Sequence, residues 1–179
     1  MPVSLVNTTH ATLYPDSVYV DATLFCHARN RLAPQYQSAR MILGNLVVQH
    51  VIIYISNLVM DEIWWALLNV YYGSTNLNKR LTHKKFKRNP QILDPYKNLI
   101  RRNTDKTLRF PNVQILPTHQ YSLNVMHAAK NIFMSENIMP RDCFHLAFAV
   151  TSNIHGFVTS DSDFDNLNLS QYNLTVFKY

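Results

Sequence analysis

The chain has 179 residues, a formal net charge of +6, two cysteines and only three glycines. This length suits a single domain with its own core, and the scarcity of glycine excludes the loops G-x-G-x-x-G and G-x-x-x-x-G-K-[ST] that hold nucleotides. Without a run of 18 apolar residues, a signal peptide or a C-x-x-C pair, the sequence predicts a cytoplasmic protein that does not bind membranes and carries Cys26 and Cys143 as free buried thiols.

The first half of the chain alternates apolar runs with amphipathic ones. Residues 17–25 (SVYVDATLF) are β-branched and aromatic, and they predict a buried strand. A helix is expected over about 35–50, where Pro34 favours its start, and a second strand over 51–55. The serine or asparagine at the start of 56–72 can cap a further helix, which the glycine and polar residues after it would end.

The second half repeats this alternation. Residues 113–116 form another short apolar run, and 118–134 show the apolar spacing of a helix. Pro140 opens the next helix, and 157–160 (FVTS) and 174–177 predict the last strands. Strands that alternate with helices predict an α/β domain in which helices cover both faces of a mostly parallel sheet.

A basic segment lies at about 79–109. It holds eleven of the 17 basic residues and two acids, a net charge of +9, whereas the rest of the chain has six bases and nine acids. Residues 1–179 contain no linker or repeat, so we expect one domain that carries this segment as a partly helical insertion. Dense positive charge interleaved with aromatic residues indicates a nucleic-acid contact; a solvated face or an acidic protein partner is the alternative. The expected contacts are Lys84, Lys85, Lys87, Arg88, Arg101 and Arg102.

The acidic residues gather at strand ends and in two helices. Ligands of open α/β sheets bind beyond the carboxyl ends of the strands. One acid ends the apolar core of the first strand, and two follow the FVTS strand. Another lies in the first turn of the helix at Pro140, and a pair lies in the helix at 56–72 among apolar neighbours. In this order, the residues are Asp21, Asp161, Asp163, Asp142, Asp61 and Glu62.

Several carboxylates at one place repel each other, and a divalent cation removes this conflict. Oxygen ligands favour Mg²⁺ or Mn²⁺ over zinc. Such an ion can activate water for attack on a phosphodiester, and two ions can hold the entering and leaving oxygens. Taken singly, Asp142 could cap its helix, and residues 161–163 could form an ordinary turn. The recurrence of acids at strand ends favours a metal site.

Three blocks of sequence resemble a PIN domain, most closely the VapC-type toxin ribonucleases. They are VYVDATLF around Asp21, SNLVMDEIWWALL with Glu62 six residues after Ser56, and PRDCFHLAFAVTSNIHGFVTSDSDF. The third block is the most specific, because it joins an acid that opens a helix, an alanine-rich face and a T-x-D-x-D-F turn. Together the blocks frame residues 17–177, nearly the whole chain.

The resemblance implies a three-layer α/β/α sandwich and a metal-dependent endoribonuclease that acts on RNA. The implied metal ligands and catalytic carboxylates are Asp21, Glu62, Asp142 and Asp161, and Asp163 either supports Asp161 or shares its catalytic role. Supporting positions are expected at Thr23, Asp61, His145 and Thr159. Within the Asp61–Glu62 pair, the spacing from Ser56 favours Glu62. VapC-type members commonly form dimers and are held inactive by a small antitoxin protein, so the resemblance also implies these partners.

Other functions fit the sequence less well than a metal-dependent endoribonuclease does. The extra length leaves a PIN nuclease outside any toxin–antitoxin pair, or one that acts on DNA, as alternatives. A non-catalytic RNA-binding or protein-binding PIN-like module would be expected to lack one of the four acids, and none is missing. A haloacid-dehalogenase-type phosphatase needs an acid where Thr23 stands, a serine hydrolase needs G-x-S-x-G, and the eight histidines lack H-E-x-x-H spacing. The sequence therefore favours the nuclease.

Overall fold

The computed structural model describes residues 5–9, 11–76, 81–165, 167 and 169–179, and a parallel β-sheet lies at its centre. The strands are β1 (Leu5–Asn7), β2 (Ser17–Val20), β3 (Ile52–Ile55), β4 (Val113–Ile115), β5 (Gly156–Thr159) and β6 (Thr175–Lys178). Their order is β1-β6-β5-β2-β3-β4, and every neighbouring pair runs parallel. The predicted α/β class and parallel sheet are confirmed.

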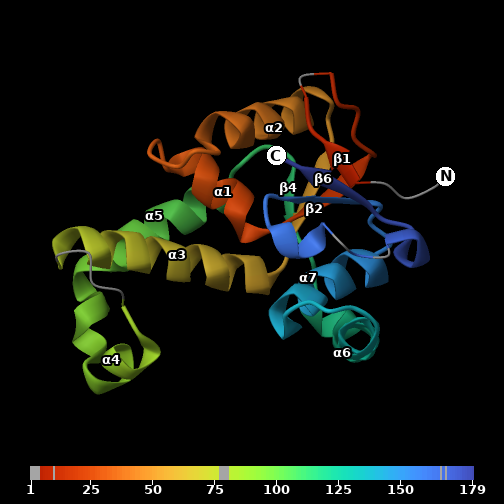
Figure 1. Cartoon of the computed structure of the whole chain (residues 1–179). Helices are drawn as coiled ribbons and strands as arrows, with labels where there is room; N and C mark the ends of the chain where they lie inside the picture. Colours follow the sequence, from red (N-terminus) through yellow and green to blue (C-terminus); the bar gives the residue numbers. More distant parts are fainter. Residues whose placement is uncertain (1–4, 10, 77–80, 166, 168) are drawn as a thin grey trace.

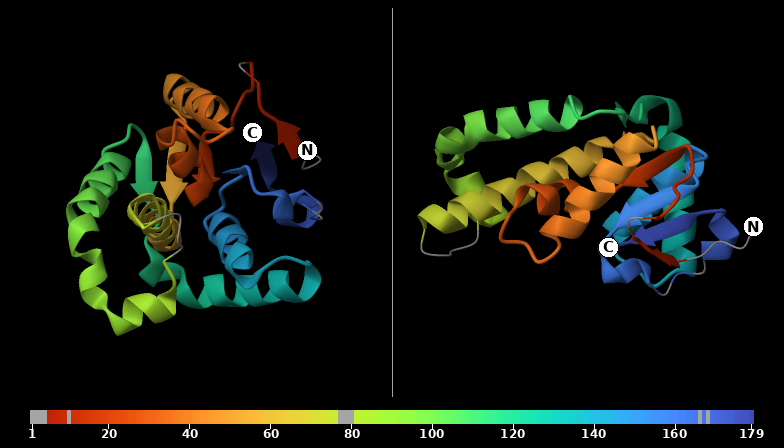
Figure 2. Two further views of the ribbon diagram at one scale, coloured as in Figure 1. Left: turned by 60° about the vertical axis from the view of Figure 1, so that its left-hand side comes forward. Right: turned by 90° about the horizontal axis from the view of Figure 1, so that it is seen from above.

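Helices cover both faces of the sheet. They are α1 (Ala22–Arg29), α2 (Tyr36–Val48), α3 (Asn57–Thr75), α4 (His83–Arg88), α5 (Lys97–Leu108), α6 (Thr118–Ser135) and α7 (Pro140–Thr151), with short 3-10 segments η1 (Pro90–Tyr96), η2 (Ser162–Phe164) and η3 (Leu169–Tyr172). α1 and α2 lie on one side of the sheet, and α6 and α7 lie on the other (Figure 1). The left view of Figure 2 shows the same three layers from another side.

The predicted strand at 17–25 is two elements rather than one, so this prediction was wrong beyond Val20. β2 ends there, and α1 begins directly after Asp21, whose extended backbone and side-chain hydrogen bond cap the helix. The first half of the run is apolar because β2 is buried in the sheet. The second half is apolar because α1 buries its leucine and phenylalanine against the core.

The N-terminal segment adds an edge strand that its sequence did not predict. β1 has three residues and pairs with β6, so segments from the two ends of the chain lie side by side at one edge of the sheet. Its burial alternates between exposed and half-buried. Three residues are too few for a period of two to stand out from chance.

Four connections that lead into strands contain a residue with positive φ that is not glycine. These residues are His50 (φ 55°), Asn112 (φ 63°), Asn153 (φ 54°) and Asn173 (φ 50°). After two of them, the amides of Val51 and Ile154 donate to carbonyls of the preceding helix, at Leu46 and Ala149, and this ends α2 and α7. Asparagine enters the left-handed region more readily than most residues. A chain poor in glycine can therefore still turn sharply from helix to strand.

The core and the surface follow from this arrangement. Val18, Tyr19 and Val20 of the central strand have no exposed surface. Both cysteines are free; Cys143 is buried, as predicted, and Cys26 is half-buried. Within the described residues, no helix is long and apolar enough to cross a membrane.

The described part of the basic segment, residues 81–109, contains α4, η1 and α5; residues 79 and 80 lie outside the described residues. α5 runs alongside α3, and the indole N–H of Trp64 in α3 donates a 2.8 Å hydrogen bond to Thr104 Oγ1 in α5. α4 lies beyond the C-terminal end of α3 (Figure 1). The segment thus extends the molecule on the side of the sheet where β4 is the edge strand.

Candidate active site

The strand order reverses at β2, and the candidate site lies at the carboxyl end of this strand. From β2 the chain proceeds to β3 and β4 on one side, and later to β5 and β6 on the other. Such a reversal opens a crevice beyond the strand ends, where open α/β sheets bind ligands. Asp21 follows β2 directly and is 5% exposed. The first predicted ligand therefore stands where the topology provides a site.

Hydrogen bonds fix the Asp21 carboxylate from two elements. The Thr23 amide donates to Oδ1 at 2.9 Å, and the Thr23 hydroxyl donates to the same oxygen. The Thr159 hydroxyl, at the end of β5, donates to Oδ2. Burial raises the pKa of Asp21, and the hydrogen bonds from the two threonines oppose this rise because they favour the charged form. Both threonines hold the carboxylate in place; their support of a metal site stays a prediction.

The turn after β5 brings Asp161 to the same edge. The Asp161 amide donates to Thr159 Oγ1 at 2.9 Å, and the Asp161 carboxylate accepts from the Asp163 amide at 3.0 Å, which caps η2. Asp161 lines a cavity at the end of β2, whereas Asp163 is exposed and does not line it. Of the two acids, Asp161 is the one that faces the site.

Glu62 reaches the site from the second turn of α3, and a buried chain of hydrogen bonds holds it. His145 Nε2 lies 2.9 Å from Glu62 Oε2, and His145 Nδ1 lies 2.9 Å from the Tyr19 hydroxyl. Tyr19 is in turn 2.7 Å from Ser56 Oγ, the N-cap of α3. A carboxylate only accepts hydrogen bonds, so Nε2 donates to Glu62. One chain of contacts thus links the cap of α3 to its acid.

Asp61 and Glu62 have different surroundings although they are adjacent. The Asp61 side chain is 63% exposed and lies 3.1 Å from Arg141 Nη2. The Glu62 side chain is 18% exposed, lines the cavity and lies 3.3 Å from Arg141 Nε. The geometry therefore brings Glu62, and not Asp61, into the site.

Asp142 lies in the first turn of α7 without capping it. The N-cap is Met139, and no side-chain hydrogen bond is made there. Burial raises the pKa of Asp142 to about 6, and the charges of Asp161, Asp163 and Glu62 add to the rise, whereas His145 opposes it. The helix-capping role considered for Asp142 is not observed. Its raised pKa reflects burial first and repulsion within the acidic cluster second.

One cavity of about 320 Å³ is lined by all four carboxylates that the sequence predicted as ligands: Asp21, Glu62, Asp142 and Asp161. Thr23 and His145 also line it. In the described part of the chain, no three His, Cys, Asp or Glu side chains are arranged to hold one metal ion as they stand. The donor set is nevertheless made of oxygens with mutually repelling charge, which is the chemistry that Mg²⁺ and Mn²⁺ prefer.

The structure places the predicted basic contacts away from this cavity. None of the six, from Lys84 to Arg102, lines it. Lys85 of α4 lies 4.9 Å from the ring centroid of Tyr72, which is ten residues, or about 15 Å at 1.5 Å per residue, along α3 from Glu62. Arg101 borders a different, largely apolar depression between α3 and α5. Their contact with nucleic acid stays a prediction.

Four residues that support the site were not predicted from the sequence as part of it. The sequence predicts Tyr19 only in a buried strand and Ser56 only as a helix cap, yet the two side chains are hydrogen-bonded and Tyr19 also contacts His145. Arg141 pairs with both acids of α3, and Tyr179 lies 3.2 Å from Thr23 Oγ1. The one signal in the sequence was the polar hydroxyl of Tyr19 inside an otherwise apolar strand, because a buried hydroxyl needs a partner.

Comparison with known proteins identifies the class of this fold and site. Residues 18–168 match the family described as the PIN domain, so the chain belongs to the PIN domain family, whose members are generally nucleases that use divalent metals. Comparison of the sequence with curated proteins finds no match.

Two solved structures resemble the chain. One is VapBC2 from Rickettsia felis bound to a DNA fragment from their promoter, with a TM-score of 0.52, 14% sequence identity, and coverage of 91% of this chain and 98% of that chain. The other is FitAcB from Neisseria gonorrhoeae, with a TM-score of 0.44, 14% identity, and coverage of 90% and 96%. At this identity, the likeness to VapBC2 bears on the fold alone.

Proposed function

We propose that this PIN domain protein is a divalent-metal-dependent endoribonuclease and the toxin of a toxin–antitoxin pair. The observation that carries the nuclease proposal is the cavity at the carboxyl end of β2, lined by carboxylates from four different elements. In a domain that only binds RNA, four acids with little compensating charge would destabilise the fold without serving the function. A catalytic site that takes a cation gives them a use.

The residues that would hold Mg²⁺ or Mn²⁺ are Asp21, Glu62, Asp142 and Asp161. When bound, such an ion supplies a water of lowered pKa and positive charge beside the phosphate. The protein's own part is positional. The threonine hydroxyls hold the Asp21 carboxylate, and His145 holds the Glu62 carboxylate, which limits the orientations that these two groups can take.

The partners are part of the proposal. VapBC2 is a complex in its crystal structure, and the shared fold supports an antitoxin protein as the inhibitor of this chain. A homodimer is supported by exposed apolar side chains on α6, among them Leu123, Met126, Phe133 and Met134. The two free cysteines agree with action in the cytoplasm.

The nuclease is tested by incubating single-stranded RNA of mixed sequence with the purified protein in Mg²⁺, in Mn²⁺ and in EDTA. Cleavage is expected only with metal. Asp21→Asn and Asp142→Asn should each reduce its rate by roughly 100-fold or more, because loss of a ligand costs at least as much as loss of its support. Asp105→Asn is the matched control, since Asp105 is an exposed carboxylate on α5 outside the cavity.

A further pair of variants assigns the acid of α3. Glu62→Gln should lose activity like Asp142→Asn, and Asp61→Asn should lose much less. If folded Asp21→Asn and Asp142→Asn proteins cleave as the wild type does, the nuclease proposal is wrong. Binding of RNA without metal-dependent cleavage would instead point to a PIN-like binding module.

A further inference from the structure

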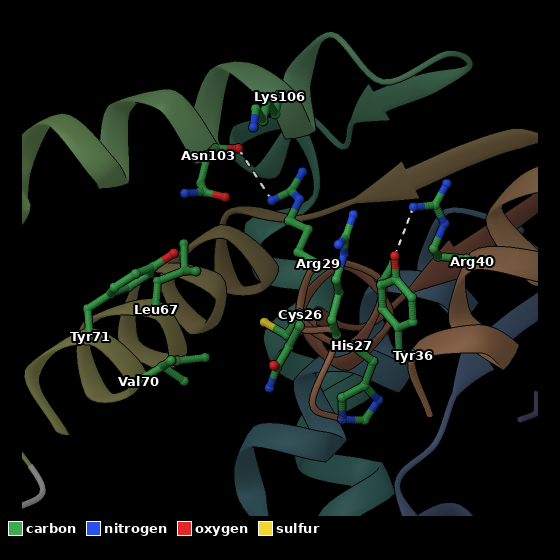
Figure 3. Close-up of a pocket in the computed structure, with 14 residues that line it drawn as sticks. Cys26, His27, Arg29, Tyr36, Arg40, Leu67, Val70, Tyr71, Asn103 and Lys106 are labelled. Carbon is green, nitrogen blue, oxygen red and sulfur yellow. Dashed lines mark hydrogen bonds between the residues drawn. The ribbon is translucent and has the colours of Figure 1, made fainter. Parts of the chain in front are cut away.

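A second cavity, of about 540 Å³, adjoins the acidic one and has the opposite charge. It lies between α1, the start of α2, α3 and α5, and Figure 3 shows the side chains that face it. The cations among them come from three elements and the loop after α1: Arg29, Arg31, Arg40 and Lys106. None of the described residues that line this cavity is acidic.

The positive charge in this cavity is not neutralised by the protein. All eleven acids of the chain are among the described residues, and none lies within 4 Å of the charged nitrogens of these four cations. Arg29 is half-buried, and its guanidinium donates only to a neutral group, the Asn103 carbonyl at 3.4 Å. Burial lowers the pKa of Arg29, which means that its charge is poorly solvated. An anion would satisfy these groups.

The protein also restrains one of the exposed cations. Arg40 donates to the Tyr36 hydroxyl at 3.0 Å, and its guanidinium lies 5.6 Å from the Tyr36 ring centroid. Figure 3 shows this pair on one side of the cavity, with Arg29 and Lys106 nearer α5. Groups held in this way lose less conformational freedom when they bind an anion than free side chains do.

The two cavities share a wall. Cys26, His27 and Ala66 line both of them, so the basic cavity lies directly beside the four carboxylates. A nucleic acid carries phosphates at regular intervals along its chain. One phosphate can therefore lie on the cations while a neighbouring one lies at the acidic site. An acidic peptide would also be attracted to the cations, but its remaining carboxylates would have no cationic partner at the neighbouring acidic site unless a metal ion is bound there.

We propose that the cavity lined by Arg29, Arg31, Arg40 and Lys106 binds a phosphate of the RNA strand next to the bond that is cleaved. This inference rests on the proposed nuclease function and adds to it a substrate subsite in place of a diffuse basic surface. Tyr36 and Tyr71 also line the basic cavity, and their aromatic rings can stack on an unpaired base.

The test measures the affinity of the protein for a short fluorescent single-stranded RNA of random sequence, in EDTA, between about 50 and 200 mM salt. The variant Arg31→Gln/Arg40→Gln/Lys106→Gln should reduce the slope of log K against log salt by about 0.7, since it removes the one phosphate contact that the cavity makes and each such contact on a single strand contributes about 0.7. Arg29 is left in place because it is half-buried. Circular dichroism checks that each variant is folded.

Two controls separate a phosphate subsite from a general loss of charge. Arg31→Lys/Arg40→Lys keeps the charges and should keep the wild-type slope. Lys130→Gln removes an exposed charge from α6, away from both cavities, and should also leave the slope unchanged. The inference is overturned if the triple variant has the same slope as Lys130→Gln.

The outcomes also distinguish the two proposals from each other. If the wild type cleaves RNA with metal but the triple variant keeps its slope, only the subsite is wrong. If the wild type neither binds nor cleaves RNA, the nuclease function fails and the subsite fails with it.

A fluorescent poly-glutamate peptide is measured in parallel. If the triple variant weakens binding of this peptide but not of RNA, the cavity serves an acidic protein, and the inference is overturned.

Discussion

At the scale of single residues, the acids of the site differ in how their charge is supported. Asp21 is held by two threonine hydroxyls, and Glu62 is held by His145 and Arg141. Asp142 has neither kind of support; burial and its acidic neighbours raise its pKa to about 6. Without a cation, ionisation of Asp142 therefore destabilises the folded protein. The carboxylate with the least internal compensation is the one that gains most from a metal.

Asp142→Asn should stabilise the metal-free protein at pH 8 and change little at pH 4. A raised folded-state pKa means that the destabilisation grows as the pH rises from about 4 to 6 and stays constant above that. Two pKa units correspond to about 3 kcal/mol, which solvent screening of a half-exposed side chain reduces to roughly 1–2 kcal/mol. Thermal unfolding in EDTA measures this as a rise in Tm of about 2–8 °C.

Adding Mg²⁺ should reverse this order, since it stabilises the wild type and not Asp142→Asn. The exposed Asp105→Asn variant serves as the control and should stay within about 0.5 kcal/mol of the wild type at both pH values. If Asp142→Asn is less stable than the wild type at pH 8 in EDTA, ionisation of Asp142 does not destabilise the metal-free protein.

At the scale of secondary-structure elements, close packing of strands decides where the acids meet. Gly156 opens β5 and lies beside Val18 of β2. A Cβ atom at this position would come within 2.7 Å of Val18 Cγ1 and 2.9 Å of Pro15 Cγ. β5 leads directly to Thr159 and Asp161, so its register against β2 sets the contact between Thr159 and Asp21. The glycine therefore supports the site through the sheet.

Gly156→Ala should lower the free energy of unfolding by about 1–3 kcal/mol, because overpacking forces the strand or its neighbours to shift. Gly44→Ala is the matched control. A Cβ at Gly44, on the exposed side of α2, would meet no heavy atom within 4 Å, and replacement should stabilise the helix by roughly 0.5–1 kcal/mol. Urea unfolding of both variants gives the comparison, and equal effects would refute the close-packing argument.

At the scale of the whole molecule, charge is divided between two places with different relations to the site. The basic cavity adjoins the carboxylates, whereas α4 packs against Tyr72, about 15 Å along α3 from Glu62. Cations near the reacting phosphate can affect the transition state. Cations at α4 can affect only binding, equally for the ground state and the transition state.

Neutralising Lys84, Lys85, Lys87 and Arg88 to glutamine should therefore weaken RNA binding without slowing cleavage of saturating RNA. The salt slope should fall by about 0.7 for each phosphate contact that is lost, up to about 3. Single-turnover cleavage at saturating RNA should stay within about twofold of the wild type. If the slope does not change, α4 does not contact the RNA; if the saturated rate falls, α4 reaches the site.

The sequence by itself predicted the fold class and the parallel sheet, because alternating apolar runs are local patterns. The family resemblance predicted the four carboxylates, which line one cavity; their role as metal ligands stays a prediction. The end of β2 was not predicted, since a buried strand and a buried helix are equally apolar on either side of Asp21. The short edge strand β1 was not predicted, because three residues carry no periodicity.

Only the tertiary structure decided which charges act together. It separated Glu62 from Asp61, joined Ser56, Tyr19 and His145 into one support, and brought Arg29, Arg40 and Lys106 beside the acids. These residues lie far apart in the sequence, and the densest basic run, at α4, is not the one nearest the site. Proximity across helices depends on how the elements pack, and the local spacing of residues along the chain carries no record of that packing.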